Sequence, residues 1–129
     1  MNRSKVVSIE LIDAIQAAFN SHDVDAILSY FAEDCEWTMA RGPNTPEGRR
    51  LKGKKAIGDV LRARYEVIPD MRWVDMHHFI SVDGTRAASE WTVKGTPKGG
   101  PPINWLGCDL WEFRGEQVIR KDTYWKYIE

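Results

Sequence analysis

Apolar side chains recur at helical spacing in three places in the first half of the chain. From residue 9 to residue 19 they return every three or four positions, which predicts an amphipathic helix. Asp23 predicts the start of a second helix, because its carboxylate can accept the free amide hydrogens of a first turn. A third helix is predicted over 54–67, where Pro69 ends the pattern. The inward positions of the second and third helices are Val24, Ile27, Leu28, Phe31, Ile57, Val60, Leu61 and Tyr65.

Elsewhere the apolar positions alternate with a period of two, which predicts strands. The first such strand alternates Cys35, Trp37 and Met39 with polar or small residues. The segment 42–53 that follows is rich in glycine, proline and charge, and it is predicted to be a loop.

Two hairpins are predicted in the second half of the chain. The runs 72–82 and 85–93 flank Asp83-Gly84, a dipeptide favoured in the type I′ turns of two-residue hairpins. The runs 103–113 and 117–128 flank a second short turn.

Helices followed by antiparallel strands are typical of an α+β fold with helices packed on one face of a curved sheet. No repeat or linker divides the sequence, so residues 1–129 are expected to form a single domain. The outer sheet face is also apolar in places, through Phe79, Cys108 and Leu110. These residues favour a homodimer whose subunits meet through the sheet.

A two-residue turn at Asp83-Gly84 fixes the register expected for the first hairpin. His77 would then face Glu90 on the outer side, while His78 would point inward. Because neighbouring strand residues point to opposite faces, the two histidines are not expected to share an ion, and no metal site is predicted. The inward pairs predicted by this register are Ile80–Ala87, His78–Ser89, Met76–Trp91 and Val74–Val93.

The stretch LGCDLWEF, residues 106–113, places the carboxylate of Asp109 inside a run that otherwise predicts a buried strand. A buried charge costs several kcal/mol unless it is paired or hydrogen-bonded. A two-residue turn in this hairpin would set Asp109 against Asp122, and the two carboxylates would share a proton. A three-residue turn would set it against Lys121 instead and keep it charged. The sequence leaves both registers open.

Composition narrows the classes of function. A net charge of −1 over 129 residues gives no reason to expect a nucleic-acid partner. No apolar run approaches the length of a membrane span and no signal-type segment is evident, so a cytoplasmic location away from membranes is expected. Cys35 and Cys108 form no metal or redox motif and are interpreted as reduced thiols.

Six tryptophans are unusual for a chain of this length. Aromatic residues at strand spacing usually form a core, but they also form the walls of pockets for apolar ring compounds. We interpret one group of aromatic residues as candidate walls, namely Trp37, Trp91, Trp105, Trp111 and Tyr124. The candidate polar groups of such a pocket are Asp109, His78 and Asp122.

Three runs, in this order, carry a resemblance to a known family: AFNSHDVDAILSYFAEDCEW (18–37), RLKGKKAIGDVL (50–61) and GCDLWEFRGEQVIRKDTYW (107–125). The chain resembles the nuclear transport factor 2-like superfamily, and within it the SnoaL-like and ketosteroid isomerase-like proteins. The resemblance implies a cone in which a strongly bent sheet wraps around three helices, encloses an apolar pocket and commonly dimerises. Such proteins include isomerases, polyketide cyclases and dehydratases, and also non-catalytic binding modules.

By the same resemblance, Asp109 matches the acid in the oxyanion hole of the steroid isomerases, which donates a hydrogen bond to a developing enolate. Two positions depart from that pattern. The general-base aspartate falls at Met39, and the tyrosine that completes the oxyanion hole falls at Ile15. The resemblance therefore does not extend to ketosteroid isomerisation itself.

Two functions follow as hypotheses. In the first, the pocket binds a hydrophobic, carbonyl-bearing ring compound and catalyses isomerisation, cyclisation or dehydration without a cofactor. Asp109 would be the acid, base or hydrogen-bond donor, with His78 and Asp122 as its partners. In the second, the protein is a non-catalytic dimeric binding or assembly module, and Asp109 forms a structural ion pair with Lys121 or Arg120.

Overall fold

The computed structural model describes residues 7–129. Its helices are α1 (Ile9–Ser21), α2 (Val24–Leu28) and α3 (Gly53–Val67). The predicted cap of α2 is confirmed, because the Asp23 carboxylate accepts a hydrogen bond of 3.1 Å from the Ala26 amide. Within the described residues, none of the helices combines the length and apolar character needed to cross a membrane.

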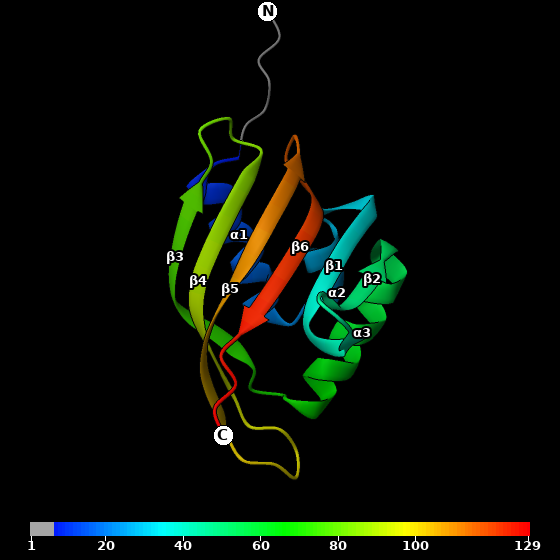
Figure 1. The fold of residues 1–129 in the computed structure, drawn as a ribbon, viewed down its shortest axis with the longest axis vertical. Coiled ribbons are helices and arrows are strands. Elements are labelled where there is room, and N and C mark those ends of the chain that lie inside the picture. The colour runs from blue at the N-terminus through cyan, green and yellow to red at the C-terminus, as the bar shows by residue number, and fades with distance from the viewer. Residues whose placement is uncertain (1–6) are drawn as a thin grey trace, which may run out of the picture.

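Six strands form one sheet in the order β2-β1-β6-β5-β4-β3, as Figure 1 shows. The neighbouring strands β1 and β6 are parallel, and all other neighbours are antiparallel. The bounds are β1 (Phe31–Asn44), β2 (Gly48–Lys52), β3 (Arg72–Ile80), β4 (Arg86–Gly95), β5 (Ile103–Arg114) and β6 (Gln117–Trp125). This arrangement confirms the α+β prediction.

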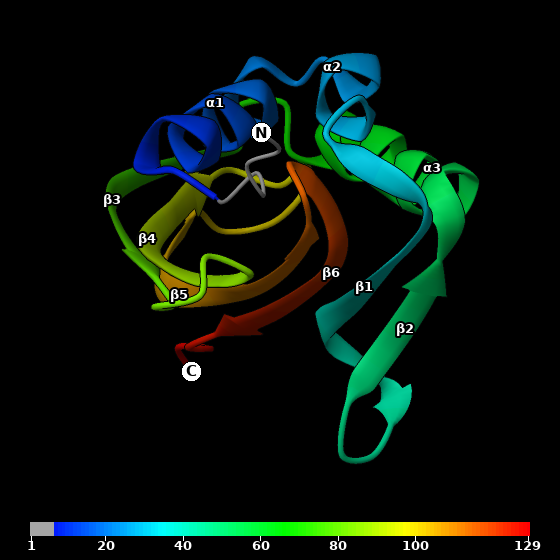
Figure 2. The same cartoon turned by 90° about the horizontal axis from the view of Figure 1, so that it is seen from above.

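The sheet is strongly curved, and Figure 2 shows the helices covering its concave side. One cause is a β-bulge in β3 at Asp75, whose φ is 54°. The pairs Ile80–Ala87 and His78–Ser89 are as predicted, but beyond the bulge Trp73 pairs with Val93. The predicted pairs Met76–Trp91 and Val74–Val93 are therefore wrong, because an extra residue on β3 shifts the register by one.

The segment 42–53 is not the loop that its composition predicts. Residues 48–52 form β2, which pairs with β1 at one edge of the sheet, where Trp37 lies opposite Leu51. A charged strand with little apolar alternation is typical of a sheet edge, because only one side of its backbone is paired. Its composition therefore resembles that of a loop.

The core lies between the helices and the concave sheet face. The large side chains that are buried there include Ile12, Ile15, Phe31, Trp37 and Trp111. Cys35 is buried and Cys108 half-buried, both as free thiols.

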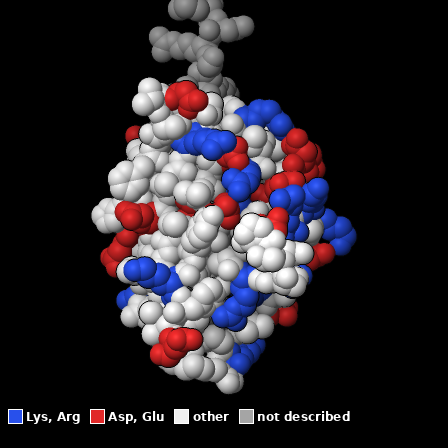
Figure 3. Space-filling view, viewed as in Figure 1, with Lys and Arg blue, Asp and Glu red and all other residues white. Residues whose placement is uncertain are grey.

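The convex face of the sheet leaves several large apolar side chains exposed. They are Phe79, Leu106, Leu110 and Tyr124. Figure 3 shows an uncharged area across this face with charged groups around it. The homodimer expected from this face stays a prediction.

The turn at Asp83-Gly84 differs from the predicted type I′ turn. Of the two turn residues, only Gly84 has a positive φ, 72°. The Gly84 amide donates to the Ser81 carbonyl at 3.0 Å. The Asp83 carboxylate accepts three hydrogen bonds, from the Ser81 hydroxyl and from the amide and hydroxyl of Thr85. These bonds lower the pKa of Asp83 below its ordinary value, the Ser81 hydroxyl contributing most.

This turn yields a prediction for the pH dependence of stability. Because the folded state holds the pKa of Asp83 below the ordinary 3.8, its carboxylate stabilises the fold above that pH and loses this effect as the pH falls further. We expect Asp83→Asn to unfold at a lower urea concentration than wild type at pH 7. The difference should shrink below pH 3.8. A difference of the same size at both ends of the pH range would contradict this account.

Candidate functional site

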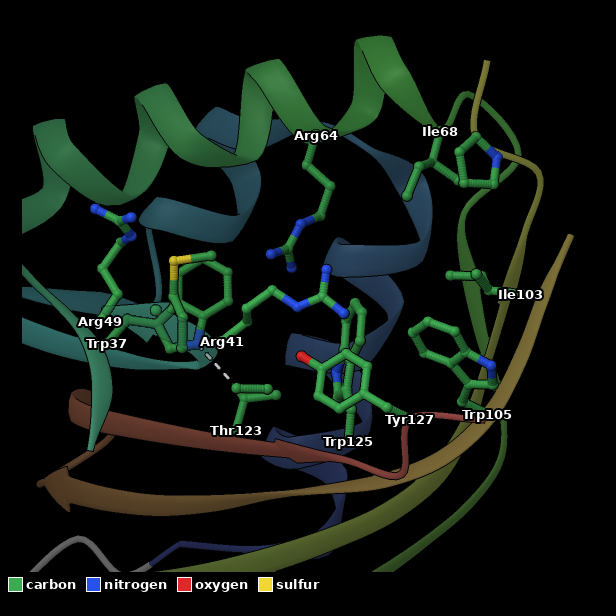
Figure 4. Close-up of a pocket in the computed structure, with 14 residues that line it drawn as sticks. Trp37, Arg41, Arg49, Arg64, Ile68, Ile103, Trp105, Thr123, Trp125 and Tyr127 are labelled. Atoms are coloured by element: carbon green, nitrogen blue, oxygen red, sulfur yellow. Dashed lines mark hydrogen bonds between the residues drawn. The ribbon is translucent and has the colours of Figure 1, made fainter. Parts of the chain in front are cut away.

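A cavity of about 390 Å³ opens below α3, between the β1–β2 hairpin and the ends of β5 and β6. Figure 4 shows its lining side chains converging from these elements. The lining residues are Trp37, Met39, Ala40, Arg41, Gly42, Arg49, Arg64, Ile68, Pro97, Ile103, Trp105, Thr123, Trp125 and Tyr127. A volume of this size suits a ligand of a few fused rings.

Aromatic side chains form the walls of the cavity. Trp37 enters from β1, Trp105 from β5 and Trp125 from the end of β6. The rings of Trp105 and Trp125 meet edge to face with centroids 5.8 Å apart, and Tyr127 lies 5.2 Å from Trp105. Such packed rings present flat apolar surfaces against which another ring can stack.

The charged groups in the lining are Arg41, Arg49 and Arg64, and the lining contains no aspartate or glutamate. Arg64 extends from α3 into the cavity (Figure 4), and its guanidinium lies 5.2 Å from the Trp37 ring and 5.4 Å from the Trp125 ring. Within residues 7–129, no hydrogen bond or ion pair is made by this guanidinium. Burial lowers the pKa of Arg64, with smaller opposing effects from Tyr65, Tyr127 and Asp109.

Asp109 is buried, with 2% of its surface exposed, and its neighbours explain how a charge is tolerated there. Its carboxylate accepts hydrogen bonds from Trp91 Nε1 at 3.0 Å and from Thr123 Oγ1 at 2.6 Å. The Lys121 ammonium lies 3.5 Å from the same carboxylate. Two of these neighbours donate hydrogen bonds and the third is a cation, which is the environment of an ionised carboxylate.

Neither register considered for the second hairpin is correct. The turn has two residues, because Arg114 lies opposite Gln117. The register of β6 then shifts by one residue before Arg120. Asp109 therefore lies opposite Thr123, not opposite Asp122 or Lys121. The sequence contains no signal for this irregularity, which places Lys121 diagonally beside Asp109.

Lys121 is enclosed by aromatic rings as well as by Asp109. Its ammonium lies 4.6 Å from the Phe19 ring centre and 4.3 Å from that of Trp37. Burial lowers the pKa of Lys121, while the nearby Asp109 carboxylate opposes that shift and Arg64 adds to it. The ion pair therefore balances two desolvated charges against each other.

A short hydrogen-bond chain connects Asp109 to the cavity. Trp37 Nε1 donates to Thr123 Oγ1 at 2.9 Å, the interaction dashed in Figure 4, and the Thr123 hydroxyl donates to Asp109. Thr123 lines the cavity and Asp109 does not. The carboxylate therefore lies one hydrogen bond behind the cavity wall.

His78 lies outside this cavity, in a second network that runs from the buried Ser89 to the exposed Asp13. Its Nδ1 is 2.8 Å from Ser89 Oγ and its Nε2 is 3.0 Å from Asp13 Oδ1, while Trp111 Nε1 donates to the same serine oxygen. These contacts join α1 to β3, β4 and β5 through side chains. His78 therefore lies apart from the cavity-lining residues.

The other predicted site residues are divided between the cavity, the core and the outer face. Trp37 and Trp105 line the cavity, while Trp91 is a buried hydrogen-bond donor to Asp109. Tyr124 and Asp122 lie together on the outer side, where the tyrosine hydroxyl is 3.3 Å from the carboxylate. Asp122 is also paired with Arg120 at 3.0 Å.

Sequence reasoning missed Arg64, Thr123, Trp125 and Tyr127. A signal existed for Arg64, because it follows Leu61 by three residues and so shares the inward side of α3 with Ile57, Leu61 and Tyr65. Arginine at a core-facing helical position is uncommon unless it is paired or serves a ligand. For the residues from β6, the unexpected register shift hid which side chains point inward.

The described residues contain no cluster of metal ligands. Across residues 7–129, no group of three histidine, cysteine, aspartate or glutamate side chains is placed to hold an ion.

Comparison with known proteins identifies the family. A model of the SnoaL-like domain matches residues 12–121, so the chain belongs to the SnoaL-like family. No curated protein matches it in sequence.

Solved structures confirm the fold. A candidate polyketide cyclase from Xanthomonas campestris pv. campestris superimposes with a TM-score of 0.79 at 25% identity, over 91% of this chain and 88% of that one. A protein from Catenulispora acidiphila, with a ketosteroid isomerase-like fold and bound trimethylamine, gives 0.76 at 20% identity, over 92% and 86%. TerC, co-crystallised with polyporic acid, gives 0.74 at 24% identity, over 92% and 90%.

The buried ion pair yields a prediction for stability. Lys121→Met should lower the free energy of unfolding by about 3 kcal/mol, because it leaves the Asp109 carboxylate buried without a cation. Combining it with Asp109→Asn should cost less than the sum of the two single changes. Urea denaturation measures all three variants. Lys55→Met, which removes an exposed i,i+4 pair with Asp59, is the control and should change stability by less than about 0.5 kcal/mol. A Lys121→Met variant as stable as the control would contradict a stabilising role for the Lys121–Asp109 ion pair.

Proposed function

We propose that this protein binds a hydrophobic, carbonyl-bearing ring compound in the aromatic cavity and catalyses proton transfer on it, as an isomerase or a cyclase does. Asp109 is the proton acceptor and acts through Thr123. The observation that carries the proposal is the 2.6 Å hydrogen bond from Thr123, a cavity-lining residue, to the buried Asp109 carboxylate. It gives the cavity a base that water does not reach.

The walls and the family both support this class of ligand. Packed indole and phenol rings around an opening of about 390 Å³ favour a flat apolar molecule. Membership of the SnoaL-like family, and the similarity to a candidate polyketide cyclase, support chemistry on cyclic carbonyl compounds.

The proposed proton transfer proceeds through Thr123. A C–H bond next to the substrate carbonyl breaks, and its proton passes to the Thr123 oxygen as the Thr123 hydroxyl proton passes to Asp109. The electron pair of the broken bond becomes an enolate, and its negative oxygen is stabilised by the combined positive charge of the three arginines in the lining. Return of a proton to a different atom completes an isomerisation, while attack of the carbanion on a second carbonyl closes a ring.

In this scheme Asp109 is a base and does not donate the hydrogen bond that the steroid isomerases require. Trp91 and Thr123 already donate to it and Lys121 pairs with its charge, so its oxygens are acceptors in the resting protein. The enolate is stabilised by arginine in place of a protonated carboxyl group. No cofactor is part of this reaction.

The second candidate function is a non-catalytic binding module. The observation in its favour is the contact of 3.5 Å between Lys121 and Asp109, which is the structural ion pair that this alternative requires. In that case the cavity binds the same kind of ring compound, and no bond in the ligand changes.

Deuterium exchange into 2-tetralone distinguishes the two candidates. Exchange of its acidic C–H protons in D₂O, followed by NMR, should be accelerated by wild-type protein. Thr123→Val should slow this exchange by about 100-fold or more, because it removes the hydroxyl between ligand and base. Asp109→Asn should do the same, and 2-tetralone should still bind to both variants.

Thr92→Val is the matched control, since Thr92 lies on β4 away from the cavity lining. It should leave the exchange rate unchanged. Binding of 2-tetralone without accelerated exchange in wild type would support the binding module and overturn the catalytic proposal. Equal rates in wild type and Thr123→Val would overturn the role of Thr123.

A further inference from the structure

We propose that the ring compound carries an ionised acidic group, such as a carboxylate, and that Arg64 binds this group, with Arg41 and Arg49 at the cavity mouth. This inference rests on the proposed binding of a ring compound in the cavity and specifies its charge. It concerns recognition and is independent of whether the bound molecule reacts.

The arginines of this protein divide into two groups. Of the nine in residues 7–129, six pair with a carboxylate within 4.0 Å: Arg50, Arg62, Arg72, Arg86, Arg114 and Arg120. The three for which no carboxylate partner occurs among the described residues are Arg41, Arg49 and Arg64, and all three line the cavity. Because the chain as a whole has a net charge of −1, this local excess of positive charge is a property of the cavity.

Arg64 has the strongest reason to bind an anion. Arg41 and Arg49 are exposed, so water solvates their guanidinium groups, whereas Arg64 is half-buried. A guanidinium removed from water without a carboxylate partner costs free energy, which contacts with two indole faces offset only in part. A ligand carboxylate can accept two parallel hydrogen bonds from the Arg64 guanidinium and so replace the hydrogen bonds that water would make to it.

The rest of the lining fits the same ligand. Trp125 Nε1 is a buried donor that has no hydrogen-bond partner within residues 7–129. The Thr123 hydroxyl proton is already used by Asp109. The arginines and Trp125 Nε1 only donate, and the Tyr127 hydroxyl can donate as well, so the lining matches a ligand with several acceptor oxygens. The Arg41 guanidinium, 4.4 Å from the Tyr127 ring centre, extends this positive region towards the solvent.

A pair of probes that differ only in charge tests the inference. The probes are 2-naphthoate and 2-naphthamide, which share the ring system, and isothermal titration calorimetry measures their affinities. Wild-type protein should bind 2-naphthoate at least about tenfold more tightly than 2-naphthamide, as expected for hydrogen bonds to a charged group. Raising the NaCl concentration should weaken the binding of the anion and leave that of the amide unchanged.

Arg64→Met should remove the preference for the anion while retaining the affinity for the amide, because methionine keeps the apolar stem. Arg62→Met is the matched control. It removes an arginine of the same helix that is exposed and paired with Asp25, and it should keep the preference. Thermal unfolding checks that both variants fold, and Arg64→Lys serves as a second variant, with the preference reduced but retained.

The outcomes separate this inference from the proposed function. Equal affinity of wild type for the two probes would overturn the anion inference and leave the binding of ring compounds standing. A preference that persists in Arg64→Met would overturn the role of Arg64. Absence of binding by both probes would count against the proposed function as well.

Discussion

Burial of the Asp109 carboxylate is the constraint around which the interior is arranged. A carboxylate buried here without partners would cost several kcal/mol, a large part of the about 5–15 kcal/mol by which small domains are stable. The structure meets the cost with donors from the two strands on either side of β5, Trp91 of β4 and Thr123 of β6, and with the Lys121 ammonium. Because each donor has a direction, the network also fixes the orientation of the indole and hydroxyl groups around it.

That orientation separates a filled region of the concave face from an open one. Trp91 and Trp111 direct their ring nitrogens to Asp109 and Ser89 and complete the core. Trp37 donates to Thr123 and presents a ring face to the cavity. The open region therefore begins where the hydrogen-bond chain ends, at the Thr123 side chain.

Much of the fold could be predicted because periodicity reports which residues are buried. The three helices, the two long hairpins and the Asp23 cap all follow from local patterns whose physical cause is local. The position of β2 could not be predicted in this way, since an edge strand gains its partner from a distant part of the chain. The shifts at Asp75 and before Arg120 are equally hidden, because a bulge relieves strain that only the assembled sheet creates.

The candidate site was predictable in part for the same reasons. Asp109 stands out as a charge in an apolar run, and it does belong to the buried network beside the cavity. The aromatic residues could not be sorted, because a tryptophan in a core and a tryptophan in a cavity wall occupy the same alternating positions. Sorting them requires knowing where the sheet bends away from the helices. Arg64 was overlooked because charge on a helix normally indicates the solvent side.

The edge position of β2 has an evolutionary consequence. Arg49 lies on this strand and Arg41 on the adjoining part of β1, and both side chains are exposed, so replacing either should disturb little of the packed interior. Arg64 packs against the rings of Trp37 and Trp125, and Asp109 and Lys121 depend on each other, so changes at those positions have to be accommodated by their neighbours. Related proteins could therefore acquire new ligand preferences by altering the rim of the cavity first, while the deeper groups stay the same.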